Sequence, residues 1–510
     1  MIRAALENRP MTLLTTLPVL LPALLMGAAA LTSRGGDATH VWRRFLLLAA
    51  LAAAAAALSL GQRLAGLAAP LPAGLAASLP GAWVALLVQG LGLVIGAFSL
   101  RYLQGEAGQP RYMAALGTVL GAVQLLLLAD HWLVLIAAWA AIGLALQRLL
   151  CFYEDRPFAR LAAHKKHLAD RLADLLLVAA ALLAWRETGS GALSELWRHL
   201  DAAAPSTALQ ASAVCLVLAV VLRTALMPVH GWLMQVMEAP TPVSALLHAG
   251  VVNLGGFVLV RFSPLLEAVP ASRWLLVGSG LATALLAGLV MLTRVSIKVR
   301  LAWSTAAQMG FMVLECGLGL YTLALLHLIG HSLYKAHAFL AASDVVRQTR
   351  LRRLGAAAVP ATASLIVAPL AVAVVVGGVE SLAPAAPWPR WWSGALVLAW
   401  APLLWGPAAP GALRRLLTGA VLVAGLTAAA LVGHALPLGV RDAPASAAGL
   451  VALGGLALLY AGLALLQAQP QALAGWRRWS YAGFYLDEVV TRAALRLWPA
   501  RWAPGAHQPQ

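Results

Sequence analysis

The amino-acid sequence predicts an all-α polytopic membrane protein, a bundle of about 13 to 15 transmembrane helices that includes discontinuous ones. Of the 510 residues, 61% are hydrophobic and 11% are charged, whereas a soluble domain carries about a quarter charged residues. The mean hydropathy is +0.83. Apolar windows recur along most of the chain, and one of them is interrupted by prolines and charged residues. These observations exclude an ordinary soluble domain.

Each predicted helix rests on a window of about 20 apolar residues, which is long enough to cross a hydrocarbon core of roughly 30 Å. The first window is too long for the apolar region of a typical signal peptide and lacks a clear small-residue cleavage site, so we expect a helix there. The boundaries are soft, and thirteen or fourteen helices would also fit. We place fifteen windows near 11–32, 45–60, 81–100, 113–129, 131–150, 168–186, 208–226, 243–262, 272–293, 298–318, 321–342, 357–379, 391–408, 411–433 and 447–467.

Lys and Arg residues are distributed unevenly over the connections between these windows. One alternating set of connections holds 25 of the 36 Lys and Arg residues, and the N-terminus with the other set holds nine. The positive-inside rule therefore predicts an external N-terminus and a cytoplasmic C-terminus, in a multi-pass protein of a bacterial inner membrane. The net charge of +17 fits this topology and an attraction to anionic lipid, and we do not expect nucleic-acid binding.

The two remaining basic residues, Arg223 and Lys335, lie inside predicted membrane segments. Charged groups in hydrocarbon are costly and usually face a bundle interior or a water-filled path, so each should have a partner or a function. Arg223 opens a stretch in which His230, Glu238 and His248 surround three prolines. Proline interrupts a helix, and a broken helix with ionisable groups at bilayer depth is typical of ion transporters.

Lys335 belongs to a second polar stretch. His327, His331 and Lys335 are spaced i, i+4, i+8, so they share one face of a helix and form a stripe about 12 Å long. One interpretation is that these groups hydrogen-bond across helices and hold the packing together. The alternative, favoured by three aligned groups, is a proton or cation path, because imidazole and desolvated lysine can exchange protons.

Three further acidic or basic sites have open interpretations. Glu315, in the preceding window, is either an ion-pair partner of Lys335 or Arg223 or itself a relay station. Arg171 and Asp174 form a structural pair at the start of the sixth helix in our interpretation.

Other charged positions have simpler explanations. Lys165 and Lys166 are interpreted as anchors at the membrane surface. Glu380 is interpreted as a solvated residue at the outer end of the twelfth helix, and the alternative is that it belongs to a proton path. Cys151, Cys215 and Cys316 are far apart and predict neither a disulfide framework nor a cysteine-bound metal. No dinucleotide fingerprint or zinc constellation is present in the sequence, so we expect a transporter subunit and not an enzyme, with no cofactor in this chain.

Several motifs together resemble the proton-conducting antiporter family of complex I and Mrp membrane subunits. The resemblance covers the third to twelfth helices, and the C-terminal YAGFYLDEVVTR is similar to the tail of the longest complex I antiporter-like subunit. The motifs, in chain order, are RTALMP, HGWL, EAPTPVSALLHAG, IKVRLAWSTAAQMGFM and HLIGHSLYKAHAFL. Within the family, the residues of these motifs are most similar to those of the membrane subunits of two-component inorganic-carbon accumulation systems. The absence of a long lateral helix also fits those subunits.

The resemblance implies roles for individual residues. Arg223 stands where the family usually has a pumping lysine, and His248 matches the histidine of the next helix. His327, His331 and Lys335 match the family's central hydrophilic axis, and Glu380 lies near a terminal lysine or glutamate. The family's helix-five glutamate, however, falls on Ala140.

This departure changes the expected mechanism. Because arginine is effectively never deprotonated, Arg223 is expected to be a fixed charge paired with Glu238 or Glu315, with His230 beside it. Protons would then pass through His248, His327, His331 and Lys335, with Glu315.

The resemblance also implies a function and a partner. The chain would conduct protons, or sodium ions, and so energise the conversion of CO2 to bicarbonate by a zinc-containing, carbonic-anhydrase-like partner. The alternative is a translocating subunit of a complex I, membrane hydrogenase or Mrp-type complex. We expect four units: N-terminal helices (1–110), a conducting core (111–385), C-terminal helices (386–470) and a cytoplasmic tail (471–510).

Overall fold

The computed structural model describes residues 2–33, 37–342, 360–383, 387–407, 412–469 and 471–499. Within these ranges the chain is helical, and its extended pairing consists of two isolated bridges, Leu75 with Ala129 and His131 with Ala192. Helices dominate because lipid offers no hydrogen bonds, so a spanning backbone must satisfy its own polar groups. The expected all-α membrane bundle is confirmed, whereas the division into four units stays a prediction. Residues 500–510 of the predicted tail lie outside the described residues.

Ten helices in the described part of the chain are long and apolar enough to cross a membrane. The other five predicted windows also fall on helices: α6, α8, α14 and α15, which carry polar groups or are short, and α18. The fifteen elements are α1 (Ile2–Thr32), α2 (Ala38–Leu64), α3 (Leu79–Tyr102), α4 (Gln109–Leu128), α5 (Trp132–Leu150), α6 (Pro157–Thr188), α8 (Thr207–Arg223), α10 with α11 (Thr241–Ala249, Leu254–Arg261), α13 (Pro270–Leu292), α14 (Ile297–Leu318), α15 (Tyr321–Leu340), α17 (Thr362–Glu380), α18 (Arg390–Trp400), α19 (Ala412–His434) and α20 (Ser446–Ala468).

Two spans are interrupted, and the first break lies in the stretch where the prolines predict one. Helix α8 ends at Arg223, and Ala225 adopts a left-handed conformation before the cis bond between Met227 and Pro228. The chain then forms only the short helices α9 (Gly231–Gln235) and η1 (Val236–Glu238) before α10. Helices α10 and α11 are separated by Gly250 and the single turn η2 (Val251–Asn253). Irregular backbone is tolerated at membrane depth where protein surrounds it, and 94% of the 241–261 window is buried.

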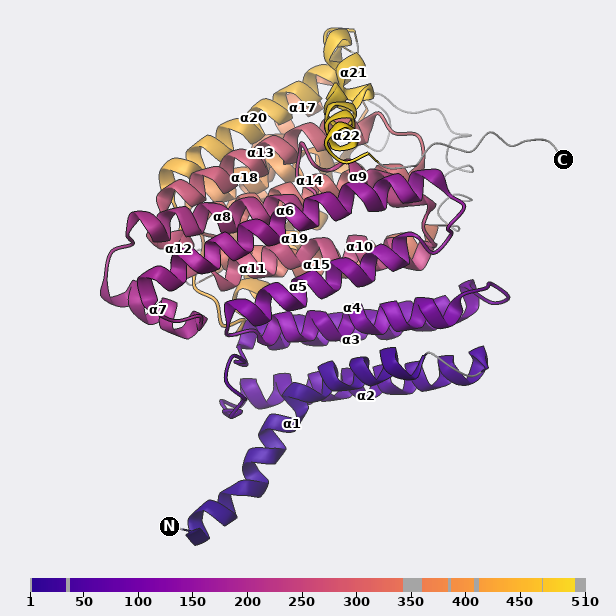
Figure 1. Ribbon diagram of the computed structural model, residues 1–510. Coiled ribbons are helices and arrows are strands. Elements are labelled where there is room, and N and C mark those ends of the chain that lie inside the picture. The colour runs from indigo at the N-terminus through magenta and orange to yellow at the C-terminus, as the bar shows by residue number, and fades with distance from the viewer. Residues whose placement is uncertain are drawn as a thin grey trace, which may run out of the picture.

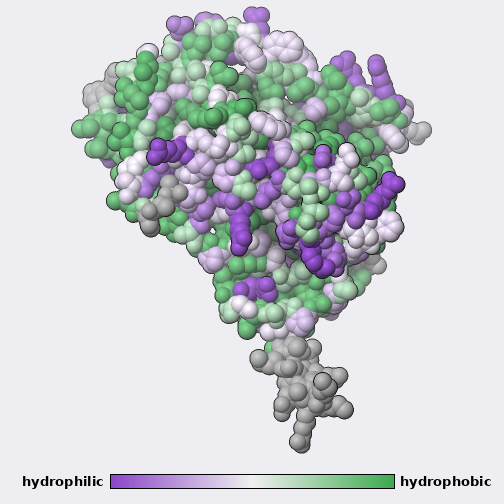
Figure 2. Space-filling model, turned by 90° about the vertical axis from the view of Figure 1, so that its left-hand side faces the viewer, coloured by the Kyte–Doolittle hydropathy of each residue, from purple (hydrophilic) through white to green (hydrophobic). Residues whose placement is uncertain are grey.

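The long helices run side by side, and shorter elements close the two ends of the bundle (Figure 1). At one end lie α7 (Leu193–Ala202) and α12 (Ser263–Ala268); Figure 2 views this end, where hydrophilic residues gather between apolar flanks. At the other end lie α21 (Ala474–Tyr481), η4 (Gly483–Tyr485) and α22 (Leu486–Leu497). We refer to these as the α7 end and the α22 end.

Candidate functional site

The polar stripe predicted on one helix face exists on α15 and is extended by α14. His327 Nδ1 lies 2.8 Å from Glu315 Oε2, and the rings of His327 and His331 are 6.0 Å apart. One turn further, Lys335 is fully buried, and its ammonium group donates to Ser304 Oγ at 2.9 Å and to a backbone carbonyl. We call Glu315, His327, His331 and Lys335 the central row. Glu315 therefore pairs with His327. The alternative in which it pairs with Lys335 or Arg223 is wrong, and the alternative in which it is a relay station stays a prediction.

His248 lies beside the central row on α10, which packs against α15. Its ring stacks on Phe339, one turn after Lys335, with centroids 4.5 Å apart. Within the break of this span, Asn253 donates to Ser332 Oγ at 2.7 Å, and α10 and α11 on either side of it also pack against α15. Both ring nitrogens of His248 and of His331 are buried without a hydrogen-bond partner among the described residues. Such groups are nearly always satisfied by protein or water, so an ordered water molecule is the partner that these nitrogens would require.

Arg223 is paired with Asp174, a residue of α6. Its guanidinium group also donates to the carbonyl of Trp139 at 2.8 Å and lies over the Trp139 ring. Trp139 precedes Ala140 on α5, so Arg223 does reach the helix on which the family's glutamate is expected. The carboxylate, however, comes from the neighbouring helix, because α6 packs along α8. The expected partners Glu238 and Glu315 were therefore wrong for Arg223.

The expected contact between Arg171 and Asp174 is confirmed at 2.9 Å, but it lies in the middle of a helix. Helix α6 begins at Pro157 and is much longer than the sixth window, so these residues are not at its start. Asp174 thus pairs with two arginines, one from its own helix and one from α8.

Lys165 and Lys166 are buried ion-pair partners, so their interpretation as membrane-surface anchors is wrong. Lys166 pairs with Asp170, one turn along α6. A Cβ atom on Gly143 of α5 would lie 2.6 Å from the Asp170 carboxylate, so the glycine makes the room for this pair. Lys166, Asp170 and Asp174 follow one face of α6 at i, i+4, i+8 and form a second line of charges that ends at Arg223.

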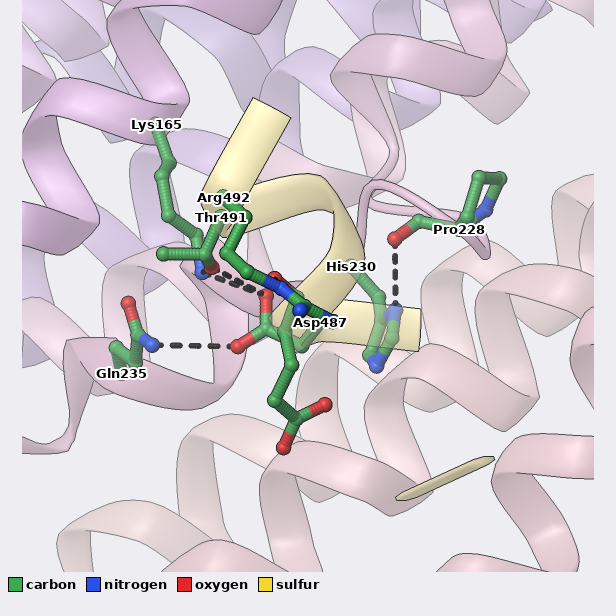
Figure 3. Close-up of polar contacts among 8 residues, drawn as sticks. Lys165, Pro228, His230, Gln235, Asp487, Thr491 and Arg492 are labelled. Carbon is green, nitrogen blue, oxygen red and sulfur yellow. Dashed lines mark hydrogen bonds and ion pairs between the residues drawn. The ribbon is translucent and has the colours of Figure 1, made fainter. Parts of the chain in front are cut away.

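The C-terminal helix α22 brings a carboxylate to the α22 end of this second line. Asp487 accepts a hydrogen bond from Lys165 Nζ at 2.5 Å and another from Gln235 Nε2 at 3.2 Å, while Lys165 also donates to Thr491 (Figure 3). The Lys165 side chain is 4% exposed and that of Asp487 is 26% exposed. The predicted tail therefore docks on the broken span.

His230 lies next to this contact, in the interrupted span (Figure 3). It is fully buried, and its Nδ1 donates to the carbonyl of Pro228 at 3.2 Å. Its ring packs against Trp303 of α14 with centroids 4.9 Å apart. The next residue, Ser304, is the one that binds Lys335. Adjacent residues of α14 therefore contact the interrupted span and the central row.

The remaining two predicted site residues lie elsewhere. Glu238 accepts from the backbone N–H of Ala159 at 3.2 Å, and its carbonyl accepts from Arg156, so it secures the beginning of α6. Glu380 is half-buried and accepts from Trp388 at 3.0 Å and Ser393 at 2.8 Å, so its interpretation as a solvated loop residue is wrong.

A polar cluster that sequence reasoning missed joins Glu380 to the beginning of α15. The Trp388 ring lies 5.9 Å from the ring of His434, whose Nε2 is 3.0 Å from Asp442. Asp442 accepts from the backbone N–H of Thr322 at 2.7 Å, at the start of the helix that carries the central row. No local motif signals this cluster, because its members come from four separate segments.

Buried ionisable groups in two lines, an interrupted span and a bundle of apolar helices define a class of protein, the antiporter-like membrane subunits. The model of the family described as NADH:quinone oxidoreductase/Mrp antiporter, transmembrane, matches residues 129–401. A subunit of the Mrp complex from Dietzia sp. DQ12-45-1b is similar to this chain with a TM-score of 0.59 at 26% identity, over 94% of this chain and 55% of that one. A chain of the archaeal membrane-bound sulfane sulfur reductase shares the fold, with a TM-score of 0.60 at 17% identity.

Similar sequences show to which family within this class the chain belongs. The chain is 40% identical to the probable inorganic carbon transporter subunit DabB of Hydrogenovibrio crunogenus, over 83% of this chain and 85% of that protein. It is 48% identical to DabB2 of Halothiobacillus neapolitanus over 51% of this chain and 48% of that protein. NADH-ubiquinone oxidoreductase chain 5 of Metridium senile is 33% identical over 55% of this chain and 48% of that protein. This multi-pass membrane chain belongs to the DabB family of antiporter-like transporter subunits.

Proposed function

We propose that this chain conducts protons and couples their electrochemical gradient to the uptake of CO2 and its hydration to bicarbonate by a zinc-containing DabA partner. The relatives named as inorganic carbon transporter subunits support the carbon substrate and a place in a complex with at least one other subunit. The central row supports conduction. Glu315, His327 and His331 are linked by a hydrogen bond and a ring contact, and Lys335 lies one turn further along the same helix. These four ionisable groups lie in the interior of a membrane bundle, where isolated charges are too costly to be kept without a role.

The chemistry of the row favours protons over sodium ions. Imidazole accepts a proton on one nitrogen and releases one from the other, so a chain of imidazoles and water can pass protons along. A hard cation prefers several oxygen ligands. Three of the four ionisable groups in the row are nitrogen bases, and Glu315 is already engaged by His327.

Polar neighbours of the row lie towards both ends of the bundle, and we infer that they extend the path. At the α7 end, the Glu380–Trp388–His434–Asp442 cluster meets the start of α15. Towards the α22 end, Lys335 binds Ser304, and Trp303 contacts His230 close to the Asp487 carboxylate. His248 would exchange protons with Lys335 through water, and Arg223 would supply a fixed charge balanced by Asp174. In this proposal the α22 end is cytoplasmic, because basic connections gather there.

The alternative function, a proton- or sodium-translocating subunit of a complex I, membrane hydrogenase or Mrp-type complex, is favoured by the matched family and the Mrp likeness. Purification of the tagged chain from its native membrane distinguishes the two. One large soluble zinc protein that copurifies supports the first function. Several small membrane subunits or iron–sulfur proteins support the second.

Co-expression with DabA in a carbonic-anhydrase-deficient host tests the first function directly. We expect the pair to restore growth in air, an uncoupler to abolish the rescue, and Lys335→Ala to abolish it as well. Lys298→Ala is the matched control, because Lys298 donates to Thr241 and is not part of the row. Rescue that survives both the uncoupler and Lys335→Ala would overturn the proposal.

A further inference from the structure

A groove of about 1310 Å³ runs along the lipid-facing flank of the bundle at the α22 end. Its walls are the last two turns of α13, the last three turns of α20, and α21 with the residues on either side. The floor is apolar and is formed by leucines of α13 and α20, among them Leu285, Leu289, Leu459 and Leu463. Both helices are long and apolar enough to span the membrane, so we expect this leucine floor to face the hydrocarbon of the bilayer.

The mouth of the groove has a different chemistry. Arg477 and Arg478 line it together with Trp476, Tyr481 and Tyr485, all on or next to α21. Trp and Tyr side chains are enriched at the level of lipid headgroups, and α21 follows α20 after a short connection. The groove therefore passes from leucines to aromatic rings and then to two guanidinium groups.

The described part of the chain covers little of the α20 wall. Only 11% of the apolar window of α20 is buried, and Leu458 is 76% exposed. A membrane helix exposed in this way contacts lipid, and the lipid that fits must match both the leucine floor and the arginine mouth. Arginine pairs with phosphate through charge-assisted, bidentate hydrogen bonds.

We propose that this groove is a binding site for an anionic phospholipid, whose acyl chains lie along the leucines and whose phosphate is held by Arg477 and Arg478. Occupancy would fix α21 in place. Arg294, which follows α13, lies over the rings of both Tyr481 and Trp303, so the groove wall contacts the helix that packs on His230. Gly483, Phe484 and Tyr485 then turn the chain, in consecutive left-handed conformations, into α22 and Asp487.

Two pairs of variants test the site. Arg477→Gln with Arg478→Gln removes the headgroup contacts, and Arg492→Gln with Arg496→Gln removes the same charge from α22, whose arginines do not line the groove. Gly462→Trp fills the groove, because Gly462 lines it and a Cβ there meets no heavy atom within 4 Å. Gly454→Trp is its control, on the same helix, with equally open space and outside the lining.

The measurement is lipid retention by the full chain. The protein is reconstituted in nanodiscs of equal phosphatidylglycerol and phosphatidylcholine, extracted in mild detergent, and its bound lipids are counted by native mass spectrometry. We expect the wild type and both controls to retain phosphatidylglycerol preferentially. The double arginine variant should bind it roughly 25-fold more weakly, since each arginine near an anionic headgroup contributes about a factor of five.

Three results would overturn the proposal. Equal retention of the two lipids by the wild type would mean ordinary annular lipid. Unchanged retention by Gly462→Trp would place the lipid elsewhere. In the third result, the wild type retains neither lipid, and a partner helix crosslinks to position 462 in native membranes. The groove would then be a protein interface.

Discussion

The carboxylate of Asp487 occupies the space that a Cβ atom on Gly231 would need. Asp487 belongs to the last described helix, and Gly231 begins the short helix α9 of the interrupted span. The absence of a side chain at Gly231 is therefore what lets α22 approach closely enough for Asp487 to bind Lys165 and Gln235.

Replacement of Gly231 by alanine should therefore displace α22. Overpacking of this kind typically costs about 1–3 kcal/mol, and here it would make the docking of the C-terminal helix less stable. We expect faster tryptic cleavage at Arg492 and Arg496. Gly278→Ala on α13 is the control, because its Cβ would meet no heavy atom within 4 Å. Equal cleavage rates in the two variants would contradict the role given to Gly231.

Loss of the Asp174 carboxylate should destabilise the bundle. The Arg223 side chain is 3% exposed, and a buried charge that loses its partner costs about 3 kcal/mol or more. We expect Asp174→Asn to lower the thermal unfolding midpoint in detergent. Glu195→Gln, which breaks the exposed pair with Arg198, should change it little. The double replacement Arg223→Met with Asp174→Leu should recover most of the loss, and failure to recover would point to a role beyond charge balance.

Glu315→Gln should separate conduction from stability. Glutamine keeps the shape and a hydrogen bond to His327 but cannot accept a proton, so we expect at least a roughly tenfold loss of proton flux into proteoliposomes, in the range that a positioned acid or base contributes. The thermal midpoint should stay close to that of the wild type. Glu267→Gln, an exposed change on α12, should leave the flux intact. Wild-type flux in Glu315→Gln would show that Glu315 only orients His327.

His248→Phe tests whether this histidine acts by chemistry or by packing. Phenylalanine can keep the stacking on Phe339, so the fold should be retained, while proton exchange with Lys335 is lost. We expect loss of growth rescue at unchanged protein abundance and unchanged midpoint. Full rescue by this variant would assign His248 to packing alone.

Local periodicity predicted the three members of the central row on α15, whereas contacts between distant helices could not be predicted. His327, His331 and Lys335 belong to one helix, so their spacing alone places them on one face. Asp174 and Asp487, by contrast, meet Arg223 and Lys165 across 49 and 322 residues of sequence. Nothing in the sequence fixes which helices pack together at such separations, so Arg223 was given the wrong partners and the tail no contact.

Lys165 and Lys166 show how a local pattern can mislead. Basic residues close to an apolar window usually anchor a helix at the membrane surface, and here they are buried pairs. The acidic residues Asp170 and Asp174, which continue the i, i+4, i+8 spacing from Lys166, were the available signal. They indicate a polar face turned towards the protein interior, which a membrane anchor would not have.

The adjacent positions of Trp303 and Ser304 on α14 have a mechanical consequence. Successive residues of a helix project about 100° apart, so this one helix presents an aromatic wall to His230 and a hydroxyl acceptor to Lys335. A rotation or slide of α14 would change both contacts at once. Such a movement would transmit a displacement of the C-terminal docking site to Lys335 through side-chain contacts of this one helix.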